Sequence, residues 1–253
     1  MSAEPAPRTP VAPRWLDLDG AHNVRDVGGL RAGDRTVRSG VLLRGDHLED
    51  LSPAAAEHLC ERTGLRAVVD LRAVEEGPEP GAWMAGRPVE RLHLPLVDLT
   101  RVGADAPLQR ADGGLDFTAA YGRMLAGAGP ALVAILRFAV APGRVPLLVH
   151  CAAGKDRTGI AVALLLAAAG VDEDDIADDY AATGLRMGRV RRAMLARGGY
   201  ADVPVPVASP PLDPAPIRAV LGAVDADGGS AAHLVRHGAT DAELTRWRAL
   251  LLG

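Results

Sequence analysis

One short segment of the chain carries reactive residue types at a functional spacing. It runs from His150 to Gly159 with the sequence HCAAGKDRTG, and within it Cys151 precedes Arg157 by six positions. A thiolate is a strong nucleophile, and an Arg guanidinium is a planar fork that binds phosphate oxygens in pairs. The two together predict a loop in which a thiolate attacks a bound phosphate group.

The residues around this segment predict that it joins a buried strand to a buried helix. Residues 145–150 (VPLLVH) form a strand-like apolar run, and residues 160–169 form an apolar helix. A helix N-terminus behind a strand attracts anions, because its free N–H groups and its dipole point at one place. Such amides stabilise a thiolate and the charge on a transferring phosphoryl group. The predicted phosphate-binding residues are Ala152, Ala153, Gly154, Lys155, Asp156, Arg157 and Thr158.

A nucleotide-binding loop is the competing interpretation of Gly-Lys followed by Thr. The phosphate loop of NTPases needs a Gly five residues before its second Gly, and a Ser or Thr directly after the Lys. Val149 and Asp156 stand at those two positions. The spacing therefore argues against ATP or GTP binding.

The segment HCAAGKDRTG resembles the active-site loop HCxxGxxR[ST]G of the Cys-dependent tyrosine and dual-specificity phosphatase superfamily. Its AGKDRTG form is similar to a bacterial branch, the tyrosine/serine phosphatases of the mycobacterial secreted type, some of which also act on phosphoinositides. The resemblance implies hydrolysis of phosphotyrosine, and also of phosphoserine or phosphothreonine, through a phosphocysteine intermediate, with no metal or other cofactor. A phosphoinositide phosphatase is the alternative enzyme, and a phosphate-binding pseudophosphatase is the alternative of another class.

Further motifs extend this resemblance over roughly residues 16–252. They are Asn23 to Gly29 (NVRDVGG, resembling NxRDxGG), Asp70 to Arg72 with Glu75 three residues on (resembling DLRxxxE), and Asp179-Tyr180 (resembling DY). Gly45 departs from the pattern, because the branch has Ser at that position. We expect the NxRDxGG and DLR motifs to brace the sheet through buried ion pairs and turns.

Hydrolysis of a phosphate ester also needs a general acid for the leaving oxygen. In the branch that the chain resembles, the Asp within the loop has this role, which assigns it to Asp156. The neighbouring Lys155 and Arg157 favour the ionised carboxylate, which is unfavourable for an acid. The alternatives lie upstream, outside any WPD-like context, and are Asp98, Asp112 and Asp116.

The remaining residues of the loop each have two interpretations. Lys155 is the only Lys in a chain with 28 basic residues, so it is predicted to meet additional substrate phosphates, or else it is solvated. Thr158 either assists departure from phosphocysteine or caps the loop. His150 either orients Cys151 through a hydrogen bond or is a core histidine.

Composition limits the possible partners and compartments. The 253 residues, 48% of them hydrophobic, suit a globular domain, and the net charge of -4 argues against a general nucleic-acid binder. The two cysteines, Cys60 and Cys151, exclude a disulfide scaffold and a Cys-built zinc site, and Cys60 is expected to pack as a small apolar residue. No apolar run reaches the ~18 residues of a membrane span. We expect a cytoplasmic protein, with export without a signal peptide left open, that acts on a phosphorylated protein, peptide or phosphoinositide.

Alternating strands and helices predict an α/β fold with a central, mostly parallel sheet flanked by helices, as in protein tyrosine phosphatases, and a helical C-terminal appendage. We expect a disordered tail over residues 1–14, a single domain over 15–253, and an appendage or lid over about 184–253. Pro95 should place its strand at an edge or end it early. The expected strands are 36–44, 65–71, 92–97 and 145–150. The expected helices are 52–64, 116–126, 130–140, 160–169, 172–182, 186–196, 217–224, 231–236 and 241–252.

The expected helix over residues 186–196 is rich in arginine. Arg186, Arg189 and Arg192 share one of its faces by their spacing. This face is either a rim or lid that attracts anionic substrate, or a solvated surface that balances the acidic run at residues 172–179.

Overall fold

The computed structural model describes residues 9–76, 82–96, 108, 114–197 and 210–253. Asp98 and Asp112 lie outside the described residues, as do residues 198–209 of the predicted appendage or lid. Residues 1–8 of the predicted tail also lie outside the described residues. In the remainder of that tail, Val11 packs against the main core and Arg14 begins the first strand.

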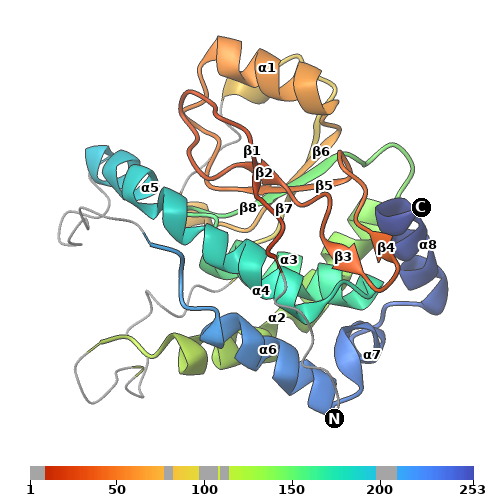
Figure 1. The fold of residues 1–253 in the computed structure, drawn as a ribbon. Helices are drawn as coiled ribbons and strands as arrows, with labels where there is room; N and C mark the ends of the chain where they lie inside the picture. The colour runs from red at the N-terminus through yellow and green to blue at the C-terminus, as the bar shows by residue number, and fades with distance from the viewer. Residues whose placement is uncertain (1–8, 77–81, 97–107, 109–113, 198–209) are drawn as a thin grey trace.

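A six-stranded sheet forms the centre of the fold, in the order β1-β2-β5-β8-β6-β7 (Figure 1). Its strands β5, β8, β6 and β7 are parallel, whereas β1 and β2 are antiparallel additions at one edge. The bounds are β1 Arg14–Trp15, β2 Arg25–Asp26, β5 Leu42–Gly45, β6 Ala67–Asp70, β7 Glu90–His93 and β8 Leu147–His150, with a separate hairpin of β3 Arg31–Ala32 and β4 Arg35–Thr36. The predicted, mostly parallel central sheet is confirmed.

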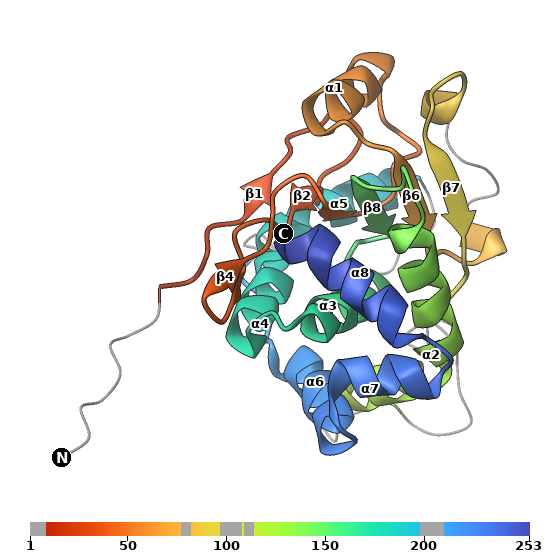
Figure 2. The same cartoon turned by 90° about the vertical axis from the view of Figure 1, so that its right-hand side faces the viewer.

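Helices cover the sheet on both faces (Figures 1 and 2). They are α1 Pro53–Thr63, α2 Phe117–Val140, α3 Asp156–Ala169, α4 Glu173–Ala182, α5 Gly184–Ala196, α6 Ala215–Ala226, α7 Gly229–Arg236 and α8 Asp241–Leu252, with short 3₁₀ turns η1 Val74–Glu76 and η2 Ala82–Met84. Helix α1 begins as predicted, with Ser52 as its N-cap and Gly64 in a left-handed conformation at its end.

The central strands are buried on both faces, so each contributes to two hydrophobic clusters. In β8, Leu147 and Val149 join the main cluster, while Leu148 joins the second cluster beneath α1. This alternation follows from the two-residue period of a strand. Cys60, half-buried on α1, packs against the second cluster as expected.

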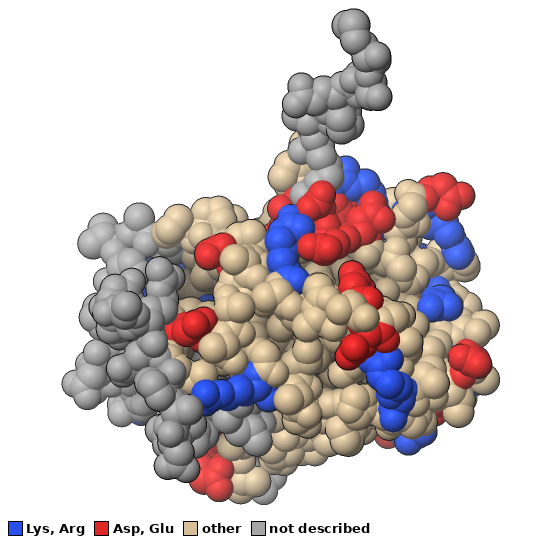
Figure 3. Space-filling model, turned by 90° about the horizontal axis from the view of Figure 1, so that it is seen from below, with Lys and Arg blue, Asp and Glu red and all other residues tan. Residues whose placement is uncertain are grey.

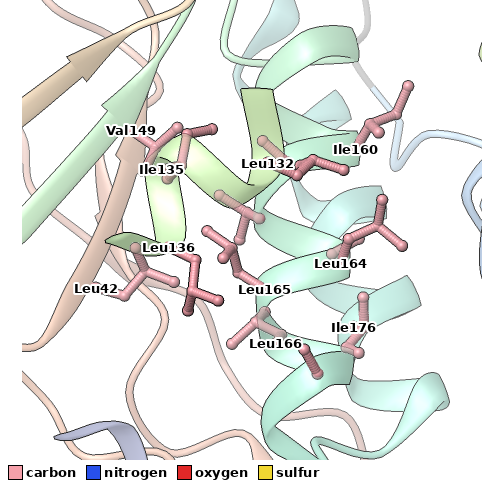
Figure 4. Close-up of a cluster of buried hydrophobic side chains, with 14 of the residues drawn as sticks. Leu42, Leu132, Ile135, Leu136, Val149, Ile160, Leu164, Leu165, Leu166 and Ile176 are labelled. Atoms are coloured by element: carbon pink, nitrogen blue, oxygen red, sulfur yellow. The ribbon is translucent and has the colours of Figure 1, made fainter. Parts of the chain in front are cut away.

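The main cluster fills the space between the sheet, α2, α3 and the C-terminal helices. Figure 4 shows side chains of β5, β8, α2 and α3 pointing toward one another there, among them Leu42, Leu136 and Leu165. The C-terminal helices share this core, since Trp247 of α8 is fully buried and donates from Nε1 to the carbonyl of Leu165 at 2.9 Å. The core therefore holds the N-terminus of α3 in place from behind.

Helix α2 corrects the sequence-based prediction of two helices, over 116–126 and 130–140. It is continuous across Pro130. Proline lacks the N–H for one helical hydrogen bond, but the residues on both sides share one buried face, and packing of that face outweighs the loss. By length and composition α2 could cross a membrane, yet 56% of its most apolar window is buried within the protein, as in the core helix of a globular domain.

Other elements also differ from the expected ones. The expected strand 36–44 is divided between β4, which ends at Thr36, and β5, which begins at Leu42. Strand β7 covers Glu90–His93 rather than 92–97 and ends before Pro95, and it is the edge strand that this proline favours. Helix α3 begins at Asp156 rather than at residue 160, which places Arg157 and Thr158 in its first turn. The phosphate-loop candidate is thus shorter and more tightly joined to the helix than predicted.

Candidate active site

The HCAAGKDRTG segment connects the carboxyl end of β8 to the N-terminus of α3, as predicted. β8 lies between β5 and β6, so the loop emerges at the centre of the sheet. Cys151 is the first residue after the strand and is only 2% exposed. Only a group that enters the loop can reach its sulfur.

Three neighbouring segments bind the carbonyl oxygens of the loop. The backbone N–H and Nδ1 of His47 donate to the carbonyl of Ala152 at 3.1 and 3.0 Å. Asn23 Nδ2 donates to the carbonyl of Ala153 at 3.0 Å. Arg44 Nη2 donates to the carbonyl of Gly154 at 2.9 Å. The loop is therefore held from its outer side by groups of the sheet and its connections.

The amides of these three peptides, and of the peptide before them, are left for another partner. No described residue accepts a hydrogen bond from the backbone N–H groups of residues 152–155. Since a peptide's N–H and C=O point in opposite directions, carbonyls held on the outside turn the amides inward. Unpaired amides beside a buried cysteine at a helix N-terminus make a cup with the geometry that binds an anion.

Gly154 makes this arrangement possible. Its φ is +68°, and a Cβ there would lie 2.5 Å from the carbonyl oxygen of Gly45 and 2.8 Å from Asn23 Nδ2. Gly45 in turn packs against Val24, whose Cγ2 would lie 3.0 Å from a Cβ at residue 45. The departure from Ser at position 45 thus accompanies close packing of β5 under the loop.

The NxRDxGG and DY motifs meet behind the loop in one buried ion-pair network. Arg25 Nε and Arg44 Nη1 each donate to the carboxylate of Asp179 at 2.7 Å, and Arg25 Nη1 donates to Asn23 Oδ1 at 2.9 Å. Burial alone would raise the pKa of Asp179, but the two guanidinium groups outweigh it and hold that pKa below its ordinary value. The predicted bracing role of NxRDxGG is confirmed.

The DLR motif forms a second buried network beside the first. Arg72 donates to Asp70 from Nε at 2.9 Å and from Nη2 at 2.7 Å, and Arg91 adds a bond of 2.9 Å. His150 lies 3.9 Å from Asp70, and burial lowers the pKa of His150 to about 4 despite this carboxylate. The imidazole is therefore neutral near pH 7, and its Nδ1 donates to the carbonyl of Cys151 at 3.2 Å. It is both a core histidine and a backbone support for Cys151.

The acidic residue that pairs with the loop arginine is Glu76, not the Glu75 that the sequence analysis matched to DLRxxxE. Arg157 Nη2 donates to Glu76 Oε1 at 2.7 Å, and Nη1 bonds to Oε2. Counting the motif strictly from Arg72 would have found it, because three residues separate Arg72 from Glu76. The bidentate pair fixes the plane of the buried guanidinium at the loop.

Asp156 begins α3 and is tied to the interior by a tyrosine that sequence reasoning missed. Tyr121 of α2 donates to Asp156 Oδ1 at 2.6 Å, and Lys155 Nζ lies 3.5 Å from the same oxygen. Lys155 also lies 3.7 Å from the centroid of the Phe117 ring, a cation–π geometry. The loop lysine is thus partnered rather than freely solvated.

A cavity of about 200 Å³ adjoins this side of the loop. Its walls include Lys155, Phe117 and Tyr180, together with the acidic residues Asp116 and Asp213. Asp116, one of the candidate acids, is the N-cap of α2 and accepts from the Ala119 amide at 2.9 Å. Its carboxylate therefore has a structural partner.

Thr158 is fully buried, and its hydroxyl has no hydrogen-bond partner among the described residues. A buried hydroxyl without a partner is costly. A thiolate or a phosphate oxygen in the adjacent loop is the kind of acceptor that would satisfy it.

Arg186 of α5 and Arg197, the residue directly after this helix, pair with acidic residues in the connections of the sheet. Arg186 Nη1 donates to Asp17 at 2.9 Å, and Arg197 bonds to Glu49 at 3.1 Å and to Asp50 at 2.6 Å. In the acidic run, Glu173 and Asp174 pair with Arg218 of α6, and Asp175 pairs with Arg31. On the face seen in Figure 3, acidic and basic side chains are interspersed, with no broad basic patch.

No metal ligands gather at the loop. Within the described ranges, no three His, Cys, Asp or Glu side chains are close enough together to hold a metal ion.

Comparison with known proteins shows the family of this chain. The sequence profile of a tyrosine phosphatase family matches residues 16–253. A Cupriavidus necator protein assigned by name to the tyrosine-protein phosphatases is 35% identical over 249 residues, which cover 90% of this chain and 88% of that protein. The triple specificity protein phosphatase PtpB of Mycobacterium tuberculosis is 33% identical over 191 residues, covering 65% of this chain and 67% of that protein.

A solved structure of P. aeruginosa TpbA in complex with phosphotyrosine matches with a TM-score of 0.41 and 20% identity, covering 69% of this chain and 80% of that one. The assignment rests on the sequence matches. The fold and the Cys-Arg loop define a Cys-based phosphatase of the tyrosine and dual-specificity class. The chain belongs to the tyrosine phosphatase family.

Proposed function

We propose that Cys151, Arg157 and Asp156 catalyse phosphomonoester hydrolysis in two steps. The observation that carries this assignment is the cup of unpaired amides at residues 152–155, next to the buried Cys151. In the cup, the amides bind the equatorial oxygens of the phosphoryl group, and Arg157 adds a charged donor.

In the first step, the Cys151 thiolate forms a bond to phosphorus as the bond from phosphorus to the leaving oxygen breaks. Asp156 gives its proton to that oxygen, so a phenol or an alcohol leaves. In the second step, water attacks phosphorus, and the Asp156 carboxylate accepts a proton from it. The phosphorus–sulfur bond breaks, which returns the thiolate and releases inorganic phosphate.

Thr158 supports the second step in this scheme. Its buried hydroxyl is placed one residue after Arg157 and donates to the sulfur as negative charge returns to it. The thiolate is then a better leaving group. Arg157, held by Glu76, remains in place through both steps.

We propose phosphorylated proteins or peptides as substrates, with phosphotyrosine foremost and phosphoserine or phosphothreonine in addition. The cavity beside the loop favours this class over highly anionic lipids, because Asp116 and Asp213 on its walls repel additional phosphates. Phosphoinositides are the second candidate, on account of Lys155 at the edge of the loop. We place the activity in the cytoplasm.

Phosphate release without added metal tests this assignment. The substrates are p-nitrophenyl phosphate, phosphopeptides that carry each of the three residues, and soluble phosphoinositides, with a chelator present throughout. We expect turnover of the nitrophenyl ester and a higher kcat/KM for phosphotyrosine peptides than for phosphoinositides. Activity that requires a divalent metal would contradict the proposed chemistry.

Replacement of Lys155 separates the two substrate classes. Lys155→Ala removes one positive charge beside the loop, and the loss grows with the number of negative charges on the substrate. We expect kcat/KM to fall about tenfold for a multiply phosphorylated inositol and about threefold or less for p-nitrophenyl phosphate, as steady-state kinetics would measure. An equal loss on every substrate would make Lys155 a general element of the loop and remove the main support for lipid substrates.

A further inference from the structure

Two tyrosine hydroxyls form a chain that ends on the carboxylate of Asp156. Tyr121 Oη of α2 is 2.6 Å from Asp156 Oδ1, and Tyr180 Oη of α4 is 2.7 Å from Tyr121 Oη. Both rings are buried and meet edge to face with their centroids 6.1 Å apart. Neither hydroxyl belongs to the motif that binds phosphate.

The direction of these hydrogen bonds follows from valence. A carboxylate oxygen only accepts, so the single hydroxyl proton of Tyr121 is donated to Asp156. Tyr121 can then only accept from Tyr180, whose proton must point to Tyr121. Burial, and next the charge of Asp156, raise the pKa of Tyr180 above its ordinary value, and the same causes hold the pKa of Tyr121 well above its ordinary value. Both hydroxyls therefore keep their protons at every pH at which a phosphatase works.

The chain distinguishes the two oxygens of the Asp156 carboxylate. Oδ1 accepts from Tyr121 and lies 3.5 Å from Lys155 Nζ. No described residue makes a hydrogen bond to Oδ2. An acid proton on Oδ2 leaves the bond from Tyr121 to Oδ1 intact, so this bond persists whether Asp156 is protonated or ionised.

From this geometry we infer that Tyr121 and Tyr180 are positioning residues that anchor Asp156 by one oxygen, so that the other oxygen carries the proton to and from the reacting groups. The inference rests on the proposed role of Asp156 as the general acid. It extends that role from one residue to a chain across α2, α3 and α4.

The position of Tyr180 itself is fixed by two features of the loop. Its ring lies against Gly159, where a Cβ would come within 3.0 Å of Cδ2. Its neighbour Asp179 holds Arg44, which binds the carbonyl of Gly154. The Asp179-Tyr180 pair thus supports the phosphate cup through one side chain and the acid through the other.

The titratable and charged groups that face the Asp156 carboxylate are Lys155 from the loop, Tyr121 from α2 and Tyr180 from α4. Arg44 lowers the pKa of Tyr180, and Asp213 raises it. Loss of the Tyr121 hydroxyl removes the donor that lies 2.6 Å from Asp156 Oδ1 and leaves the Lys155 ammonium, which lies 3.5 Å from the same oxygen. A carboxylate that loses a hydrogen-bond donor holds its proton to higher pH.

Replacement of Tyr121 by Phe tests the inference, because Phe fills the same space without the hydroxyl. With an alkyl phosphate, which depends on the acid, we expect Tyr121→Phe to lower kcat about tenfold, and with p-nitrophenyl phosphate much less. The alkaline limb of the kcat–pH profile should move up by about one pH unit. Tyr180→Phe keeps the direct bond to Asp156 and should show smaller changes in the same directions.

A matched control removes a buried aromatic hydrogen bond elsewhere. Trp247→Phe deletes the bond from Nε1 to the carbonyl of Leu165 in the core. It should lower Tm, while the alkaline limb of the kcat–pH profile and the dependence of kcat on the leaving group stay unchanged. A purely structural role of Tyr121 would give this same result.

A double-mutant cycle completes the experiment. In an Asp156→Asn background, Tyr121→Phe should cost no further rate, since its partner no longer transfers a proton. Suppose that Asp156→Asn shows the leaving-group dependence of an acid, but Tyr121→Phe changes neither kcat nor the alkaline limb of the kcat–pH profile. The inference is then overturned, and the assignment of Asp156 as the acid stands. If Asp156→Asn itself shows no such dependence, the acid is wrongly assigned and the inference falls with it.

Discussion

Cys151→Ser is expected to abolish turnover while anion binding survives. The serine hydroxyl keeps its proton near pH 7 and is a poor nucleophile, so kcat should fall by about 10⁴-fold or more. The amides of residues 152–155 and the Arg157 guanidinium do not depend on sulfur, so vanadate or phosphate should bind within about tenfold of the wild-type affinity. Steady-state kinetics and calorimetric titration measure the two quantities.

The second cysteine provides the control. Cys60→Ser alters a half-buried residue of α1 that packs against the second cluster, beneath that helix. Cys60 is far from the loop in sequence and lies on another element. We expect catalysis close to that of the wild type and a change in unfolding free energy of about 1 kcal/mol or less. Substantial activity in Cys151→Ser, or its loss in Cys60→Ser, would contradict the assignment of the nucleophile.

The second large effect is expected at Asp156. Asp156→Asn removes the proton for the leaving oxygen, and a general acid contributes ~10²–10⁴ in rate. An alkyl phosphate leaves as a strongly basic alkoxide and should lose most of that range, whereas nitrophenolate leaves without a proton and should lose much less. The alkaline limb of the pH–rate profile should flatten, because it reports loss of the acid proton.

Asp98→Asn is the matched control for the acid, since Asp98 was the first alternative upstream. It should leave the dependence on leaving group unchanged. If Asp98→Asn alters the dependence of the rate on the leaving group and Asp156→Asn does not, the general acid is Asp98 of the upstream segment. Asp116→Asn should likewise leave the dependence on leaving group unchanged, because the Asp116 side chain caps α2 and Asn also caps helices.

What the sequence predicted well was local. The strand 145–150, the turn and the apolar helix after it follow from short-range patterns, and Cys151 and Arg157 lie on one such unit. The buried partners of NxRDxGG could also be expected, because an arginine inside a sheet protein needs a carboxylate. Its partner, Asp179, is 154 residues away from Arg25, and only the resemblance to a motif marked it beforehand.

What the sequence did not predict depends on packing between distant segments. Pro130 is read locally as a helix end, but α2 continues because its buried face spans both sides of the proline. Tyr121 gives no local signal at all; it matters because α2 places its hydroxyl against a residue 35 positions later. Glu76 was predictable, since its spacing from Arg72 is part of the DLRxxxE motif and only the adjacent Glu75 competes with it for that position.

The central claim is that phosphate passes through a covalent bond to Cys151. The most direct test is rapid acid quench during turnover of p-nitrophenyl phosphate, followed by digestion and mass spectrometry, with wild-type enzyme and with Asp156→Asn. The variant forms the intermediate from a good leaving group but lacks the base that activates water. We predict a phosphoryl group on the peptide that contains Cys151, at low occupancy in the wild type and at higher occupancy in the variant. Turnover with no phosphate on Cys151 in either protein, or with phosphate on another side chain, would contradict the account.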